Sequence, residues 1–166
     1  MTYARTTAIA ATLLLLTGGV QGKEPALAPP AGARLLFSAA ADGVQIYACE
    51  TQGGVFAWAF KAPEAALFDE GGRQIGTHFA GPTWRAPDGS TVTGEVISKA
   101  DPGDAIPWLL LRAKAHQGGG RLAAVAFVER RDTTGGLAPA TGCDAAHRGA
   151  EARMRYSATY VFFAAP

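Results

Sequence analysis

The side chains best suited to chemistry gather in one short stretch, HFAGPTWRAPDGS, which runs from His78 to Ser90. An imidazole, an indole, a guanidinium and a carboxylate occur there, on His78, Trp84, Arg85 and Asp88. Together they can exchange hydrogen bonds, meet an anion and stack against a flat ring. The stretch is therefore the predicted location of a ligand-binding site.

Two turn signals in this stretch should bring its polar groups together. Gly81-Pro82 combines a residue free to take positive φ with one fixed near −65°, and Asp88-Gly89 is a tight-turn pair. The chain is expected to turn a corner at each, which places the candidates at one end of a sheet, where loops carry function. Trp108 is a fifth candidate, as a second flat surface. The alternative is that the tryptophans fill the core.

The same residues permit a catalytic interpretation, which the sequence leaves open. His78 could act as the general base of a small hydrolase or isomerase. Ser90 beside Asp88, with His78 upstream, could be drawn as a triad, but the G-x-S-x-G elbow that activates such a serine is missing. We assign no catalytic residue and leave enzyme activity undecided.

Neither a metal site nor a cofactor site is predicted. The three histidines, His78, His116 and His147, are not at ligand spacing, and the glycines are spread among turns and form no phosphate-binding loop. A small organic molecule or a carbohydrate, held against aromatic side chains, is the expected ligand.

The N-terminus has the layout of a secretory signal peptide. Arg5 precedes an apolar run that is too short to span a bilayer, and small residues follow it, which predicts cleavage after residue 22. Residues 23–32 form a Pro/Ala-rich linker, and residues 33–166 are expected to fold as a single domain. The mature chain is predicted to be exported to the periplasm or the extracellular space, with no transmembrane segment.

The charge balance excludes a nucleic-acid face. Of the 15 Lys and Arg residues, one lies in the signal peptide, so 14 basic residues balance 14 acidic ones. Binding to a phosphate backbone needs a clear excess of basic residues on one surface.

The two cysteines, Cys49 and Cys143, are predicted to form a disulfide because the chain is exported. Two buried free thiols are the alternative. Metal binding is disfavoured because no second ligand stands near either cysteine.

Short apolar runs separated by Gly, Asp and Pro are typical of an antiparallel all-β domain, either a sandwich or a closed barrel, with little helix. A turn is expected at Asp42-Gly43, another at residues 52–54, and a strand end or a helical turn at Pro63. The predicted strands are residues 33–39, 44–50, 55–61, 66–68, 74–79, 83–85, 90–99, 108–116, 121–130 and 154–163.

Two segments show the two-residue period of a strand. Phe56, Trp58 and Phe60 alternate with small residues, and Met154–Phe163 carries Tyr156 and Tyr160 on one face. Both aromatic faces are expected to lie in the core.

Several sequence blocks are shared with a known family. They are GVQIYAC from Gly43, HFAGPTW from His78, IPWLLL from Ile106 and YSATYVFF from Tyr156, with Cys143 between the last two. In this order they resemble a secreted family of bacteria and fungi, the domain-of-unknown-function family 3455. The resemblance implies an exported single domain and carries no activity.

The sequence thus favours a non-catalytic domain that binds a small ligand or has a structural role in the envelope or outside the cell. Substituting His78 distinguishes the two main hypotheses, because an enzyme would lose turnover by orders of magnitude.

Overall fold

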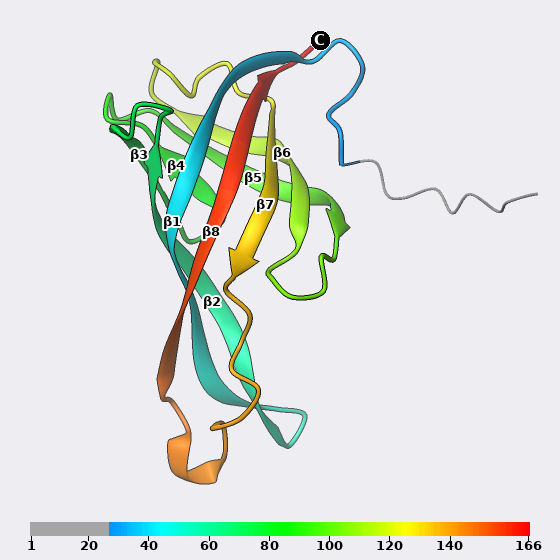
Figure 1. Ribbon diagram of the computed structural model, residues 1–166, viewed down its shortest axis with the longest axis vertical. Helices are drawn as coiled ribbons and strands as arrows, with labels where there is room; N and C mark the ends of the chain where they lie inside the picture. Colours follow the sequence, from blue (N-terminus) through cyan, green and yellow to red (C-terminus); the bar gives the residue numbers. More distant parts are fainter. Residues whose placement is uncertain (1–26) are drawn as a thin grey trace, which may run out of the picture.

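Eight antiparallel strands follow one another around a ring, and β8 closes the ring by pairing with β1 (Figure 1). The computed structural model describes residues 27–166. Of the two predicted architectures, the protein therefore adopts the barrel, in which closure leaves no open sheet edge within the ring. The strands are β1 (Arg34–Gln52), β2 (Val55–Phe68), β3 (Gln74–Phe79), β4 (Thr83–Arg85), β5 (Thr91–Ala100), β6 (Trp108–Gln117), β7 (Phe127–Gly135) and β8 (Glu151–Ala164).

The predicted turn at Asp42-Gly43 is wrong, because β1 runs through both residues without a break. Gly43 pairs with Ala65 of β2 and with Tyr156 of β8. A Cβ atom at position 43 would overlap the backbone of β2. Glycine is used here for the close approach of a neighbouring strand, which a coiled barrel wall requires, and not for a turn.

The predicted break at Pro63 is also wrong. β2 continues through it, and the helical turn considered there does not form. Pairing with β3 begins only at Ala65, so at Pro63 one side of β2 is unpaired. A proline is tolerated at such a position, because its missing N–H interrupts no ladder on that side.

The long strands extend beyond the barrel as a stem (Figure 1). The stem consists of residues 47–62, which contain the β1–β2 turn, and residues 136–152. The predicted disulfide is confirmed: Cys49 and Cys143 are bonded, and they fasten the loop before β8 to the hairpin. The indole N–H of Trp58 also donates to the carbonyl of Thr141 across 2.9 Å.

The prediction that Phe56, Trp58 and Phe60 form core is corrected by their place on this stem. Phe60 is 54% exposed, and the other two are half-buried. Their alternation indicated a strand correctly, but only one loop covers the strand face that they share.

The barrel interior is the hydrophobic core. Large side chains from opposite walls fill it, with Tyr160 and Phe162 of β8 against Trp84 of β4. Small residues on β1 and β2 leave room for them. The aromatic face predicted for residues 154–163 therefore does lie in the core from Tyr156 onward.

β7 begins later than predicted, at Phe127 and not at Arg121. Residues 118–126 form a folded loop instead, since the backbone N–H of Arg121 donates to the Asp88 carboxylate and that of Ala123 to Gly120. The predicted turn at residues 52–54 and the strands 74–79 and 83–85 are confirmed.

Among residues 27–166, helix is confined to one short turn, Ala145–His147. Within residues 27–166, no helix is long and apolar enough to cross a membrane. The predicted signal peptide and the first part of the linker, up to residue 26, lie outside the described residues.

Candidate binding site

His78 and Trp84 are direct partners across the β3–β4 ladder, and both face the barrel interior. Their rings stack with centroids 4.5 Å apart and planes 12° from parallel. The Tyr160 ring meets both edge-on, at 5.1 Å from His78 and 5.5 Å from Trp84. The two corners predicted from the sequence thus bring His78 and Trp84 together, but in the barrel interior and not on its surface.

The imidazole of His78 is held neutral. It is 3% exposed, and its Nδ1 lies 3.0 Å from the carbonyl oxygen of Thr83, so Nδ1 carries the proton and donates. Burial lowers the pKa of His78 to about 3, against a smaller opposing effect of the Thr83 bond. A base this weak takes up few protons near neutral pH, which disfavours general-base catalysis.

The tryptophans offer little stacking surface. Trp84 is 1% exposed and sits in the core, and Trp108 is half-buried with its indole nitrogen enclosed. The aromatic side chains are therefore mainly packing groups, as the alternative interpretation expected.

Arg85 and Asp88 point away from His78. The guanidinium of Arg85 lies on the outer wall, 4.9 Å from the ring centre of Phe79. Asp88 ties two loops together: its Oδ1 accepts from the backbone N–H and the hydroxyl of Ser90, and its Oδ2 from the backbone N–H of Arg121. These bonds, that of the Ser90 hydroxyl first, lower the pKa of Asp88. Ser90 thus bonds to Asp88 and Leu122, and the triad with His78 is not assembled.

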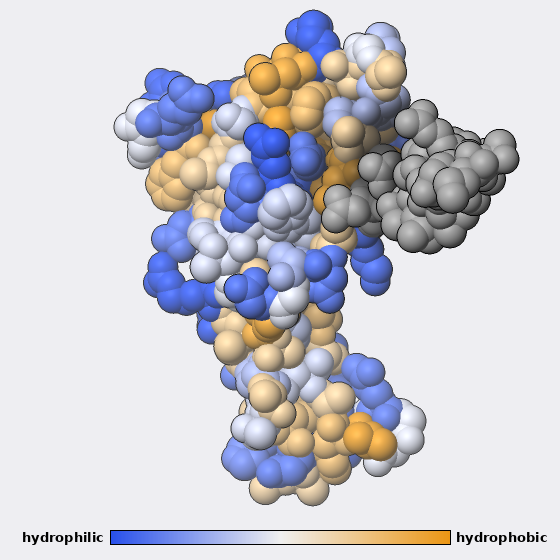
Figure 2. All heavy atoms as spheres, turned by 45° about the vertical axis from the view of Figure 1, so that its right-hand side comes forward, coloured by the Kyte–Doolittle hydropathy of each residue, from blue (hydrophilic) through white to orange (hydrophobic). Residues whose placement is uncertain are grey.

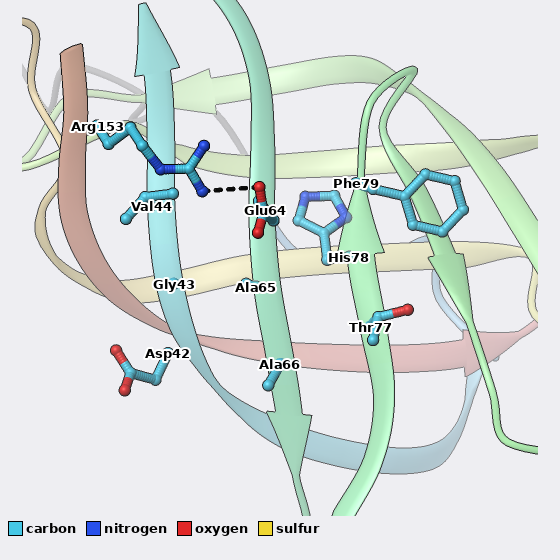
Figure 3. A pocket seen from close by; sticks show the side chains of 10 residues that line it. All are labelled: Asp42, Gly43, Val44, Glu64, Ala65, Ala66, Thr77, His78, Phe79 and Arg153. Carbon is cyan, nitrogen blue, oxygen red and sulfur yellow. Dashed lines mark hydrogen bonds and ion pairs between the residues drawn. The ribbon is translucent and has the colours of Figure 1, made fainter. Parts of the chain in front are cut away.

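A groove of about 410 Å³ lies on the outer wall over β1, β2 and β3 (Figure 3). Arg153 reaches across β1 and donates from Nη2 to Glu64 Oε2 at 2.7 Å, and this bond is the main reason that the pKa of Arg153 is raised. The His78 ring lies between β2 and β3 at the floor (Figure 3). The other lining residues are Asp42, Gly43, Val44, Ala65, Ala66, Thr77 and Phe79.

A second groove, of about 510 Å³, adjoins the first at Thr77, which lines both. It runs over β3 and β4 and is lined by Arg85 and by the turn that follows it. Of the five sequence candidates, His78 lines the first groove and Arg85 the second, whereas Trp84, Asp88 and Trp108 line neither.

Residues 30–164 match a family described as "Protein of unknown function (DUF3455)". The chain belongs to this family. No curated protein and no solved structure matches the chain. Membership in the DUF3455 family assigns no chemistry to any residue.

The groove residues that the sequence did not single out in this DUF3455 member are Asp42, Glu64 and Arg153. They come from three strands, and the Glu64–Arg153 pair is separated by 89 positions. The one local sequence feature that marks these three residues is that charged residues alternate with small ones along their strands. This alternation places the charged side chains on the outward face. Within the part of the chain that the structure describes, no three His, Cys, Asp or Glu side chains converge on a metal-sized site.

Proposed function

We propose that this DUF3455 protein is an exported, non-catalytic domain that binds a small polyhydroxylated ligand on the outer wall of its barrel. The observation that carries the proposal is the pair of adjoining grooves that share Thr77. Export is supported by the disulfide and by the signal-peptide pattern of the first 22 residues.

The lining of the first groove suits a sugar-like ligand. The carboxylates of Asp42 and Glu64 accept hydrogen bonds from hydroxyl groups, and the guanidinium of Arg153 donates them. Phe79 adds an apolar surface against which a ring can pack. A buried histidine with a pKa near 3 favours binding over proton-transfer chemistry.

The test is a titration of the folded protein with glucose, N-acetylglucosamine and galacturonic acid, followed by the amide NMR shifts of Thr77 and Phe79. We expect saturable shifts with at least one of the three sugars. The Glu64→Ala and Arg153→Ala variants should bind roughly tenfold or more weakly, because each loses a hydrogen bond to a charged group. Arg112→Ala is the matched control, since Arg112 pairs with Glu95 elsewhere on the wall. Equal affinity in the groove variants and the control would refute the proposal.

The stem supports a second candidate, a structural role outside the cytoplasm. Figure 2 shows hydrophobic atoms gathered near the end of the stem, where Val55 is 68% exposed. A structural domain would bind none of the three sugars, and its groove variants would change only stability.

A further inference from the structure

The barrel interior contains a positive charge with no negative partner. Arg130 of β7 is 8% exposed and is the one buried charged side chain within residues 27–166. Over the same residues, no Asp or Glu is buried, and no carboxylate lies within ion-pair distance of Arg130. A buried charge is expensive unless it is paired and hydrogen-bonded.

Neutral groups, the Pro107 carbonyl and the Tyr160 hydroxyl, satisfy only part of the Arg130 guanidinium. Its Nε and Nη2 donate to the carbonyl oxygen of Pro107 at 3.0 and 2.7 Å. A guanidinium has five N–H groups, so at most two are used there, and the charge itself is not neutralised. Across the β7–β8 ladder, Arg130 stands directly opposite Tyr160.

Further N–H donors are buried without a partner. In the described part of the chain, the enclosed side-chain atoms that lack a hydrogen bond are the Nε2 of Gln45 and the Nε1 of Trp84 and Trp108. All three are donors. Buried polar groups are nearly always satisfied, so a set of enclosed donors calls for an acceptor.

Gln45 and Arg130 both lie against two chain segments that are joined by a backbone hydrogen bond, residues 106–107 and 135–136. A Cβ atom at Gly136 would lie 3.2 Å from Gln45 Cγ and 2.9 Å from Ile106 Cγ2. Ile106 precedes Pro107, whose carbonyl oxygen accepts the hydrogen bonds from Arg130. Ile106 N donates to the carbonyl of Gly135, which joins the two segments.

Three tyrosine hydroxyls complete the group. Tyr156 and Tyr160 have their oxygens 3.4 Å apart, and Tyr47 donates to the carbonyl of Gly136 at 2.8 Å. Burial raises the pKa of all three, so they remain protonated donors. The Arg130 charge acts on each of them in the opposite direction. We call Gln45, Tyr47, Arg130, Tyr156 and Tyr160 the interior cluster.

We propose that the interior cluster binds one small monovalent anion, a halide or a short carboxylate, with Arg130 as the counter-charge and with Gln45 Nε2 and the one free O–H of the Tyr156–Tyr160 pair as neutral donors. This site is separate from the outer grooves and does not depend on them. The anion would supply the negative charge and the acceptor that the cluster lacks, and it would tie β1, β7 and β8 together at the junction with the stem.

The first experiment measures the Tm of the dialysed full chain in sodium gluconate, with chloride or acetate replacing gluconate at constant ionic strength. Gluconate, a six-carbon anion, is much larger than chloride or acetate and serves as the reference. A ligand that binds only the folded state raises Tm in a saturable way. We expect that rise with chloride, with acetate or with both, and the pattern tells a halide site from a carboxylate site. The same Tm in all three salts would overturn the proposal.

Variants separate the interior cluster from general salt effects. Gln45→Glu places a carboxylate of nearly the same shape beside Arg130, so its Tm should no longer respond to chloride or acetate. Gln45→Leu should weaken anion binding by roughly tenfold or more, because it removes a hydrogen bond to a charged group. Arg112→Met, which removes a surface arginine, should respond like the wild type. If the Gln45→Glu variant keeps the wild-type response, the anion acts elsewhere and the proposal fails.

A crystal of the wild-type protein in sodium bromide gives a direct readout that does not depend on any variant's folding. The expected result is an anomalous peak within contact distance of the Arg130 guanidinium and Gln45 Nε2. Water alone at this position, with bromide confined to the surface, would contradict the proposal.

Discussion

Gly43 of β1 lies against Ala65 of β2 so closely that a Cβ atom at Gly43 would be 2.5 Å from the Cα atom of Ala65 and 2.2 Å from the carbonyl oxygen of Glu64. Both obstacles are backbone or fixed to it, so no side-chain rotation can relieve the overlap. The contact also shapes the first groove, since Gly43, Glu64 and Ala65 all line it. The curvature of the wall and the shape of the groove therefore depend on the same glycine.

Gly43→Ala should destabilise the protein by about 2 kcal/mol or more, because β1 and β2 must separate to admit the methyl group. Urea unfolding followed by tryptophan fluorescence measures the loss. Gly119→Ala is the control, since a Cβ there would meet nothing within 4 Å and its φ is not positive. A Gly43→Ala variant as stable as that control would show that β1 and β2 can separate at little cost in stability.

The disulfide should contribute strongly to stability because it closes a long loop. Cys49 and Cys143 are 94 residues apart, and the chain-entropy model gives about 4.7 kcal/mol for a loop of this length. We expect the double variant Cys49→Ala/Cys143→Ala to lose that amount in urea unfolding. Trp58→Phe breaks the bond to Thr141 on the same stem and should cost far less, about 1 kcal/mol. Similar losses in the two variants would argue against the loop-closure explanation.

Local sequence patterns were sufficient where local chemistry decides the structure. β3 and β4 were predicted to the residue, because Gly81 and Gly89 take the positive φ values of tight turns. Asp42-Gly43 has the same appearance in the sequence, yet Gly43 has no positive φ and lies within a strand. What distinguishes Gly43 is its close contact with the neighbouring strand β2, which the local sequence around Gly43 does not show.

The same limit applies to the candidate site. The pairing of His78 with Trp84 follows from two nearby corners, so the sequence could predict it. The groove joins Asp42, Glu64 and Arg153 across three strands, and their meeting depends on the pairing register of β1 with β2 and β8. Alternation shows that such residues share the outer surface, but it does not show which of them become neighbours.

Asp88 should prove to be a loop anchor and not a ligand-binding residue. Asp88→Ala removes the acceptor of two hydrogen bonds from Ser90 within the β4–β5 turn and of one from Arg121, which connects that turn to the loop at residues 118–126. We expect a lower urea midpoint and faster amide exchange at Ser90 and Arg121, with sugar affinity unchanged. Asp101→Ala is the control, since the Asp101 carboxylate accepts one bond, from the N–H of Gly103. Loss of sugar binding in Asp88→Ala, without loss of stability, would contradict this assignment.

His78 should make the fold sensitive to acid. Its pKa is about 3 in the folded protein, below the value of about 6.5 in an unfolded chain, so the unfolded state binds the extra proton first. The stabilising effect of the neutral ring is complete above pH 6.5 and is lost as the pH falls from 6.5 toward 3, with a slope that approaches about 1.4 kcal/mol per pH unit. Urea unfolding at pH 7, 6, 5 and 4 measures this slope, to which carboxylates also contribute below pH 5.

The His78→Phe variant keeps an aromatic ring against Trp84 and cannot titrate, so its stability should change less than that of the wild type between pH 6.5 and 5. His116→Phe, at an exposed position on β6, is the control, since it removes a histidine that lies outside the barrel interior. Parallel pH profiles for the wild type and His78→Phe would mean that the ring takes up its proton at the same pH in the folded and unfolded states, so burial would not hold it neutral.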